Sequence, residues 1–249
     1  MQNQRLASFA GRLLVAPNDD TMSRRAAAFI EAELKSKPNL LLCASAGGTP
    51  TGTYRRLAAR HAKDPKLFRH LRVLQIDEWG GLPARHAASC RSDIESKLLR
   101  PLGIGADRFA GFKGDAANPR RECERIARWL AENGPIDICL LGLGLNGHIA
   151  MNEPANEFVL HAHVAKLART SLNHGMLKDL RKKPRYGFTL GMGDILHSRK
   201  ILLIVSGRSK RAVLRHLLER KVTSRFPASF VWLHPDPTII CDQEARADD

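Results

Sequence analysis

The residues best suited to chemistry lie in one stretch of the chain, 136–154 (IDICLLGLGLNGHIAMNEP). It begins with an apolar run typical of a buried parallel strand and continues into a glycine-rich turn that contains Asn146, His148 and Glu153. A buried strand that ends in such a turn places polar side chains at the carboxyl edge of a sheet, where open α/β proteins bind ligands. The imidazole and the carboxylate predict acid–base chemistry, because the acid can orient the ring and fix its tautomer.

The same turn matches the dinucleotide fingerprint Gly-x-Gly-x-x-Gly, at Gly142, Gly144 and Gly147. That fingerprint requires a helix to open at its last glycine and an acidic residue about 20 residues further on, at the end of the next strand. Here Pro154 disfavours a long helix, and no acidic residue ends a strand near Leu167. The match therefore does not predict a nicotinamide cofactor.

A second candidate for proton transfer is Asp77, at the end of an apolar strand predicted over 72–77. It is followed by Glu78 and Trp79. A carboxyl group beside an aromatic side chain in a partly dry cleft can have a raised pKa and accept a proton. The alternative is that the two acidic residues form a solvated turn at the end of the strand.

The turn AGGTP, at 46–50, has the composition of an anion site between a strand and a helix. Gly47 and Gly48 allow the backbone to approach a ligand, while Thr49 suits the N-cap and Pro50 the first helical position. Free N–H groups at the start of a helix favour a phosphate. An ordinary tight turn is the alternative.

A similar turn, SGRSK, lies at 206–210. Lys210 falls in the first turn of the predicted helix, where its charge opposes the helix dipole. A bound anion would relieve this conflict, so Lys210 is a candidate anion ligand. His161 and His163 are interpreted as surface residues and not as metal ligands, because no third ligand stands at a suitable spacing.

Apolar periodicity predicts the elements that must position these residues. Strands alternate with helices, and the strands are continuously apolar, which is typical of a parallel sheet covered on both faces. We predict helices over 20–37, 51–62, 88–99, 120–132 and 209–220, and strands over 39–44, 72–77, 136–141, 200–205, 229–233 and 238–241. The polar, basic segment 155–184 is weakly periodic and is predicted to form a loop or a lid.

These elements predict an α/β fold in which a single domain has a doubly wound, mostly parallel sheet with helices on both faces. The domain is expected to span 1–249, with a core over about 20–242. The chain has 43% hydrophobic and 26% charged residues, which is typical of a soluble globular protein. We expect a cytoplasmic protein without membrane contact, because no apolar run approaches the roughly 20 residues that span a bilayer and no signal-peptide core is present.

The five cysteines are dispersed and form no C-x-x-C pair, which predicts reduced, mostly buried thiols and neither disulfides nor a zinc site. The net charge is +15, but the basic residues are spread along the chain and only 6% of residues are aromatic. This pattern favours a solvated basic surface, or one that attracts anionic substrates such as sugar phosphates, over a nucleic-acid site. Nucleic-acid binding is kept as an alternative.

Five separate segments, in the same order over about residues 20–242, together resemble the glucosamine/galactosamine-6-phosphate deaminase (isomerase) family. Asn-Gly-His followed by Asn-Glu-Pro distinguishes this resemblance from a fold relative, 6-phosphogluconolactonase. LHSRKILLIVSG and PASFVWLH look closer to the galactosamine-6-phosphate branch than to the glucosamine branch. The segments are SAGGTPTGTY (45–54), QIDEWGGLP (75–83), LGLGLNGHIAMNEP (141–154), SGRSKR (206–211) and PASFVWLH (227–234).

The resemblance implies a catalytic role for four residues. Asp77 matches the base that moves a proton between C2 and C1 of the opened sugar. His148 matches the acid–base group for opening the pyranose ring, and Glu153 matches its partner. Asn146 stands where some members have Asp, and because an amide cannot act as a base, it can only orient or polarise.

The resemblance also implies a phosphate site in which Gly47, Gly48 and Thr49 form the cradle and Lys210 contacts the phosphate. An arginine expected in the 165–180 region does not align, and Arg169 and Arg185 are candidates to replace it.

The implied reaction is the isomerising deamination of an amino sugar 6-phosphate. Galactosamine 6-phosphate would give tagatose 6-phosphate and ammonia, and glucosamine 6-phosphate would give fructose 6-phosphate and ammonia. The expected partner is a small sugar phosphate, with no metal and no organic cofactor, and a homo-oligomer is left open. Lactone hydrolysis and a non-catalytic sugar-phosphate sensor are the alternatives.

Overall fold

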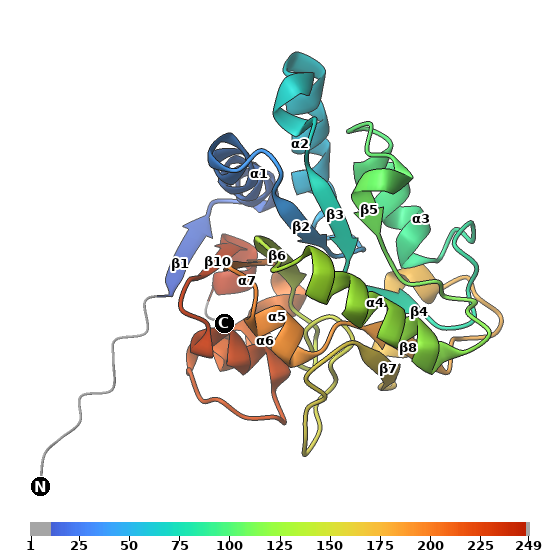
Figure 1. The fold of residues 1–249 in the computed structure, drawn as a ribbon. Coiled ribbons are helices and arrows are strands. Elements are labelled where there is room, and N and C mark those ends of the chain that lie inside the picture. Colours follow the sequence, from blue (N-terminus) through green and yellow to red (C-terminus); the bar gives the residue numbers. More distant parts are fainter. Residues whose placement is uncertain (1–10, 248–249) are drawn as a thin grey trace, which may run out of the picture.

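The computed structural model describes residues 11–247. At its centre is a seven-stranded sheet in the order β1-β10-β9-β6-β2-β3-β5, and each pairing between neighbours is parallel. Figure 1 shows this sheet between two sets of helices. Its strands are β1 (Arg12–Ala16), β2 (Leu41–Ala44), β3 (Arg72–Gln75), β5 (Phe109–Ala110), β6 (Ile138–Gly142), β9 (Lys200–Val205) and β10 (Pro237–Asp242).

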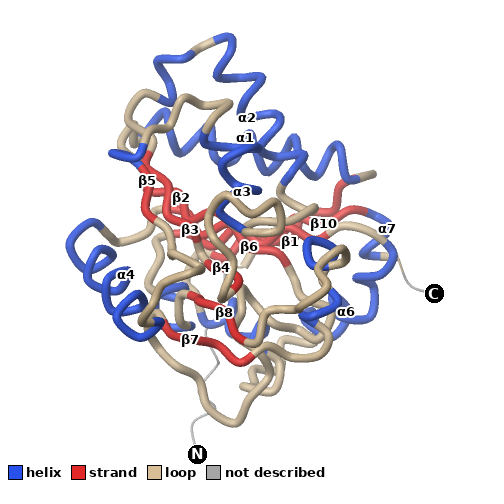
Figure 2. Tube along the Cα trace, turned by 90° about the vertical axis from the view of Figure 1, so that its right-hand side faces the viewer, coloured by secondary structure: helices blue, strands red, loops and turns tan. Residues whose placement is uncertain are grey.

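Helices cover both faces of the sheet, with α1, α2 and α3 on one side and α4 and α6 on the other (Figure 2). The predicted doubly wound α/β fold is therefore confirmed. The α-helices of the described chain are α1 (Asp19–Ser36), α2 (Thr51–Lys63), α3 (Cys90–Ile94), α4 (Pro119–Asn133), α5 (Met192–Leu196), α6 (Arg211–Leu218) and α7 (Gln243–Arg246).

Alternate residues of each strand point to opposite faces of the sheet and build two separate cores. In β6, Ile138 and Leu140 pack into the core that contains residues of α1 and α2, whereas Cys139 and Leu141 pack into the core with residues of α4, α5 and α6. Both faces of the strand are buried, which explains why the strands of this sheet are continuous apolar runs.

Local capping explains why the two longest helices lie where the sequence predicts them. The side chain of Asn18 accepts a hydrogen bond from Thr21 N at 2.9 Å at the start of α1. Asn118 caps α4 in the same way, by accepting from Arg121 N at 3.1 Å, and Pro119 occupies the first turn. Both caps satisfy N–H groups that the helix itself leaves without partners.

The strand predicted over 72–77 is only partly correct. β3 ends at Gln75, and Asp77 begins a new strand, β4 (Asp77–Trp79), in a second sheet. That sheet has three antiparallel strands in the order β4-β8-β7, where β8 is Tyr186–Thr189 and β7 is His163–Lys166. The segment 155–184 thus contains a strand that weak periodicity did not reveal, while its movement as a lid stays a prediction.

Other element predictions also need correction. The strand predicted over 229–233 is a 3-10 helix, Pro227–Leu233, and it is fixed by Trp232, whose Nε1–H donates to Leu217 O at 2.8 Å. The helix predicted over 209–220 begins as a 3-10 turn and continues as α6. The helix predicted over 88–99 is α3 followed by a wider π-helical turn, and the edge strand β1 was not predicted.

The strand order reverses between β2 and β6. From β2 the chain forms β3 and β5 on one side, and it then returns to place β6, β9 and β10 on the other side. Neighbouring strands whose connections leave in opposite directions form a topological switch point, and open α/β sheets bind ligands there, beyond the carboxyl ends of the strands. The turns that follow β2 and β6 both contain predicted site residues.

All five cysteines lie within residues 11–247, where each is buried and free, as predicted. Within the same range, none of the helices is both long enough and apolar enough to cross a membrane. The described residues also contain no group of three or more His, Cys, Asp or Glu side chains that could hold a metal ion.

Candidate active site

A cavity of about 310 Å³ lies at the switch point. The turns that follow β2, β6 and β9 contribute to its walls, and so do strand β4 and the segment 155–184. Six of the predicted site residues line this cavity: Gly47, Gly48, Thr49, Asp77, His148 and Lys210. The other two, Asn146 and Glu153, are joined to each other and to His148 by contacts beside the cavity.

The turn after β6 holds His148 through its backbone. Gly144 N–H donates to His148 O at 3.0 Å, and His148 N–H donates to Asn146 Oδ1 at 3.2 Å. A Cβ built on Gly144 would lie 2.4 Å from His148 Cδ2, so the imidazole packs directly on this glycine. No helix opens at Gly147, which has a φ of +82°, so the turn lacks the helix that the dinucleotide fingerprint requires.

Glu153 lies against the imidazole, with Oε2 at 3.4 Å from His148 Nδ1. The carboxylate accepts hydrogen bonds from Asn146 Nδ2 at 2.8 Å, from Ala168 N at 3.1 Å and from Ser171 Oγ. Burial raises the pKa of Glu153, but the hydrogen bonds and charge of His148, with those of Ser171 and Asn146, outweigh it and lower the pKa to about 2. An ionised Glu153 favours a proton on Nδ1 of His148 and leaves Nε2 able to accept one.

Ser171 completes this network and was not found from the sequence. Its Oγ donates to Glu153 and lies 3.3 Å from His148 Nδ1, and the residue is 5% exposed. It comes from a 3-10 turn inside the weakly periodic segment 155–184, so no local pattern distinguished it from the other serines.

Asp77 lines the cavity from β4. Burial raises the pKa of its carboxyl group from 3.8 to about 7, with a further rise from the neighbouring charge of Glu78, against a hydrogen bond with Cys90 that lowers it. A carboxyl group that titrates near neutral pH can both take up and return a proton, as an isomerisation requires.

Glu78 has a different environment from its neighbour in the chain. It is fully buried, and its two oxygens accept four hydrogen bonds, so it ties β4 to the start of α3. The solvated turn considered as an alternative is therefore not what the structure shows. The four donors are Trp79 N at 2.7 Å, Cys90 N at 2.8 Å, Arg91 N at 2.8 Å and Gln75 Nε2 at 3.0 Å.

The turn after β2 differs from prediction in its cap. Helix α2 begins at Thr51, so Pro50 and not Thr49 is the N-cap, and no side chain caps the helix. Thr51 Oγ1 instead donates to Gly47 O at 2.9 Å. Pro50 already takes a helical conformation, and its carbonyl oxygen accepts the hydrogen bond from Tyr54 N at 2.9 Å that opens the helix.

The N–H groups of this turn are not all available to a ligand. Gly47 has a φ of +107°, and its N–H donates to Asp93 Oδ2 at 2.9 Å. Lys97 Nζ holds the other oxygen of Asp93 at 2.5 Å. The N–H groups of Gly48 and Thr49 make no hydrogen bond to the described part of the chain, so these two are the donors left for an anion.

Lys210 lines the cavity from the turn after β9, where its Nζ donates to Leu143 O at 2.5 Å. Burial lowers the pKa of Lys210. Arg169 and Arg185, the candidates for the missing arginine, are exposed and do not line the cavity. His174 lines it instead, a residue that belongs to none of the sequence motifs.

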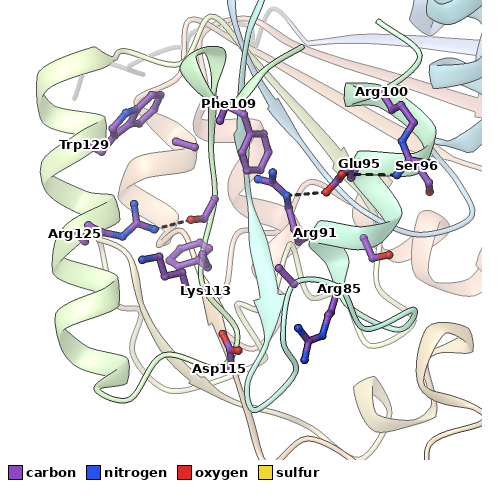
Figure 3. Close-up of a pocket in the computed structure, with 16 residues that line it drawn as sticks. Arg85, Arg91, Glu95, Ser96, Arg100, Phe109, Lys113, Asp115, Arg125 and Trp129 are labelled. Atoms are coloured by element: carbon purple, nitrogen blue, oxygen red, sulfur yellow. Dashed lines mark hydrogen bonds and ion pairs between the residues drawn. The ribbon is translucent and has the colours of Figure 1, made fainter. Parts of the chain in front are cut away.

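A larger cavity, of about 800 Å³, lies between α3 and α4 at the edge strand β5. Figure 3 shows Arg91 beside Phe109 and Arg125 reaching across from α4. Arg91 Cζ lies 3.7 Å from the centroid of the Phe109 ring, and Arg125 donates to Gly111 O at 2.6 Å. This cavity contains none of the predicted acid–base residues, so the smaller one is the candidate active site.

Comparison with known proteins agrees with this geometry. A family described as glucosamine-6-phosphate isomerases/6-phosphogluconolactonase matches residues 17–240. The chain belongs to this family. The resemblance noted in the sequence is thereby confirmed.

Three relatives illustrate the family. AgaI of Escherichia coli (strain K12), provisionally named a deaminase, is 35% identical over 224 residues, 90% of this chain and 88% of AgaI. The glucosamine-6-phosphate deaminase of Shouchella clausii (strain KSM-K16) is 35% identical over 232 residues, 92% of this chain and 94% of that enzyme. A solved structure of a monomeric glucosamine-6-phosphate deaminase has a TM-score of 0.90 at 32% identity, covering 94% of this chain and 98% of its own.

Proposed function

We propose that this family member is an amino-sugar-6-phosphate deaminase that isomerises its substrate to a keto sugar 6-phosphate and releases ammonia. The observation that carries the proposal is the shared cavity of Asp77, His148 and Lys210, in which Asp77 has a pKa of about 7. The relatives named as glucosamine-6-phosphate deaminases support the same reaction.

The proposed course begins with ring opening. His148, oriented by the ionised Glu153, accepts the proton of the C1 hydroxyl and donates a proton to the ring oxygen, which gives the open-chain aldehyde. Asn146 donates to Glu153 and so holds this carboxylate in place. The amide carries no proton that it can exchange, so its contribution is orientation.

Asp77 then performs the isomerisation. Its carboxylate removes the C2 proton to form an enolamine and returns the proton to C1, which leaves an imine at C2. Water adds to the imine carbon, and ammonia leaves with the C2–N electron pair to give the ketone. The amine itself makes the C2 proton acidic and the nitrogen a leaving group, so the proposal needs neither a metal nor an organic cofactor.

The phosphate supplies binding energy away from the reacting carbons. In our proposal, Gly48, Thr49 and Lys210 hold it, and Gly47 shapes the turn around it. Binding at this end of the substrate fixes C1 and C2 against Asp77, which lowers the entropic cost of reaching the transition state.

Galactosamine 6-phosphate is the proposed preferred substrate, giving tagatose 6-phosphate. This finer assignment is supported by the segments around 196–207 and 227–234, which look closer to the galactosamine branch. Parallel assays of ammonia release from galactosamine 6-phosphate and glucosamine 6-phosphate would test it, and a higher kcat/KM for the gluco substrate would reverse the assignment.

The decisive experiment on the reaction itself is the variant Asp77→Asn, which keeps the shape of the side chain but removes the base. Turnover should fall on the order of 100-fold or more. Asp107→Asn, an exposed acid far from the cavity walls, is the matched control and should retain full activity. Near-normal deamination by Asp77→Asn would reject the role of Asp77.

The family also includes 6-phosphogluconolactonases, so both reactions should be assayed. Lactone hydrolysis without ammonia release would replace the deaminase proposal. Binding of sugar phosphates in a thermal-shift assay, with no turnover of either substrate, would instead favour the sensor alternative.

A further inference from the structure

The phosphate end of the candidate active site contains a single lysine and no arginine. Among the described residues that line the cavity, five have side chains with an N–H group: Trp79, His148, Asn173, His174 and Lys210. Of these, the ring of His174 is the one that lies within 4 Å of a Cβ built on Gly47. His174 stands at the mouth of the cavity, in the segment that carries Ser171. The ring of His174 is therefore placed where it could contact a bound ligand.

The environment of His174 fixes which ring nitrogen carries the proton. Met176 N–H donates to Nδ1 of His174 at 3.3 Å, so Nδ1 acts as the acceptor. In the neutral ring the proton therefore resides on Nε2. Partial burial, together with the charges of His148 and Lys210, lowers the pKa of His174, which keeps the ring neutral at physiological pH.

Nε2 of His174 faces the phosphate turn. A Cβ built on Gly47 would lie 3.6 Å from Nε2 and 3.7 Å from Cε1, with no other heavy atom within 4 Å. These are ordinary van der Waals distances, so the edge of the ring that carries Nε2 lies beside the turn at Gly47. The ring also contacts Trp79, with the two ring centroids 5.8 Å apart and the two planes inclined at 47°.

We propose that His174, as a neutral imidazole that donates from Nε2, completes the phosphate site together with Lys210 and the N–H groups of Gly48 and Thr49. It takes the place of the arginine that the sequence lacks at this end of the cavity. The inference rests on the proposed function for the identity of the substrate, but the donor geometry applies to any phosphate in this position.

The test separates the donor from the ring. His174→Ala removes both the N–H donor and the ring. His174→Phe keeps a ring against Trp79 but has no N–H donor. His174→Gln has no ring but keeps an N–H donor at a similar distance from the backbone. Binding of inorganic phosphate is measured by calorimetry on the whole protein. The Kd should rise about tenfold in the Ala and Phe variants, the effect of one lost hydrogen bond to an anion, and stay within about threefold in the Gln variant.

Turnover provides the second readout. For the amino sugar 6-phosphate, KM should rise about tenfold in His174→Ala while kcat stays within about threefold, because the contact is present in both the ground state and the transition state. Lys178→Ala, an exposed change in the same segment outside the cavity, is the matched control and should leave both constants unchanged.

Each outcome is decisive. If His174→Ala or His174→Phe binds inorganic phosphate as tightly as the unaltered protein, the proposal is wrong even when deamination proceeds normally. If phosphate affinity follows the predicted order but the protein releases no ammonia, the phosphate donor stands and the proposed reaction fails. A fall in kcat alone, with KM unchanged, would also reject a phosphate contact.

Discussion

At the scale of single residues, Asp77 and Glu78 show how the surroundings of a carboxyl group set its hydrogen bonding and its pKa. Glu78 accepts hydrogen bonds from three backbone N–H groups and one amide, and has no remaining capacity for chemistry. Asp77 lacks such donors and faces the cavity, and burial raises its pKa to about 7. Two carboxyl groups in one dipeptide therefore differ in hydrogen bonding and in pKa according to the groups that surround them.

The raised pKa of Asp77 predicts opposite effects of pH on stability and on activity. Between pH 3.8 and about 7 the folded state binds a proton that the unfolded state has lost, so the contribution of Asp77 to stability declines as pH rises through this window. Asp77→Asn does not titrate. Its Tm relative to that of the unaltered protein should therefore increase from pH 5 to pH 8, as measured by calorimetry.

The same pKa predicts an effect on the kinetics, because in our proposal the ionised carboxylate of Asp77 removes the C2 proton. In the unaltered protein kcat should rise with pH toward neutrality, in the window where stability falls. A Tm difference independent of pH would show that Asp77 does not hold its proton in the folded state.

Ser171 is expected to act as a positioning residue, because it bridges Glu153 and His148. Ser171→Ala should lower kcat about tenfold with little change in KM, since the loss falls on the acid–base pair and not on substrate binding. Ser171→Thr keeps a hydroxyl group and should restore most of the activity. In the unaltered protein the pKa of Glu153 is lowered to about 2, and in the Ala variant NMR should show a higher pKa for this group. An unchanged pKa would exclude the bridging role.

At the scale of elements, the three turns that contribute to the cavity, after β2, β6 and β9, each follow a strand that is buried on both faces. The strand ends are fixed by the two cores, so the turns begin from rigid points and only a few residues have to be ordered. Glycine then decides how closely a side chain can pack on the turn. Gly144 is the clearest case, because the His148 ring occupies the place where its Cβ would be.

Gly144→Ala should therefore displace the imidazole, and activity should fall at least 100-fold in steady-state assays, since a shift of about 1 Å at an active site already costs on that order. Gly142→Ala adds the same methyl group two residues earlier, where nothing lies within 4 Å of the new Cβ. Its loss of activity should be at least tenfold smaller. Equal losses in the two variants would show that the methyl group acts on the turn as a whole and not through His148.

At the scale of the whole molecule, the chain has a net charge of +15, and the substrate that we propose carries a phosphate dianion. A positive field raises the encounter rate of an anionic substrate, and salt screens this attraction over about 10 Å at 0.1 M. We expect kcat/KM to fall several-fold between 20 mM and 300 mM salt. If kcat/KM does not change with salt, the net charge of the molecule does not attract the substrate, and the cations that line the cavity are its only electrostatic contacts.

Assays at different salt concentrations also test whether the positive charge binds nucleic acid. Duplex DNA added at 0.15 M salt should not compete with the sugar phosphate. The basic residues are spread along the chain, and no aromatic residues alternate with them to stack on bases. Tight DNA binding with a steep salt dependence would reopen the nucleic-acid alternative.

The sequence by itself determined the fold class and the residues at the ends of strands. Continuous apolar runs identify strands buried on both faces, and parallel strands share one carboxyl edge, so Asp77, His148 and Lys210 were predicted to gather there and do line one cavity. Membership of the family was also readable from the motifs. These features are local, since each depends on a few neighbouring residues and on the direction of one strand.

Only the tertiary structure decided which residues complete the site. Ser171 and His174 come from a segment without periodicity, and Asp93 reaches Gly47 from another element. β4 pairs with β8, far along the chain, which the apolar run over 72–77 does not encode. Such contacts depend on long-range hydrogen bonds that form when the elements pack, so no local pattern of residues predicts them.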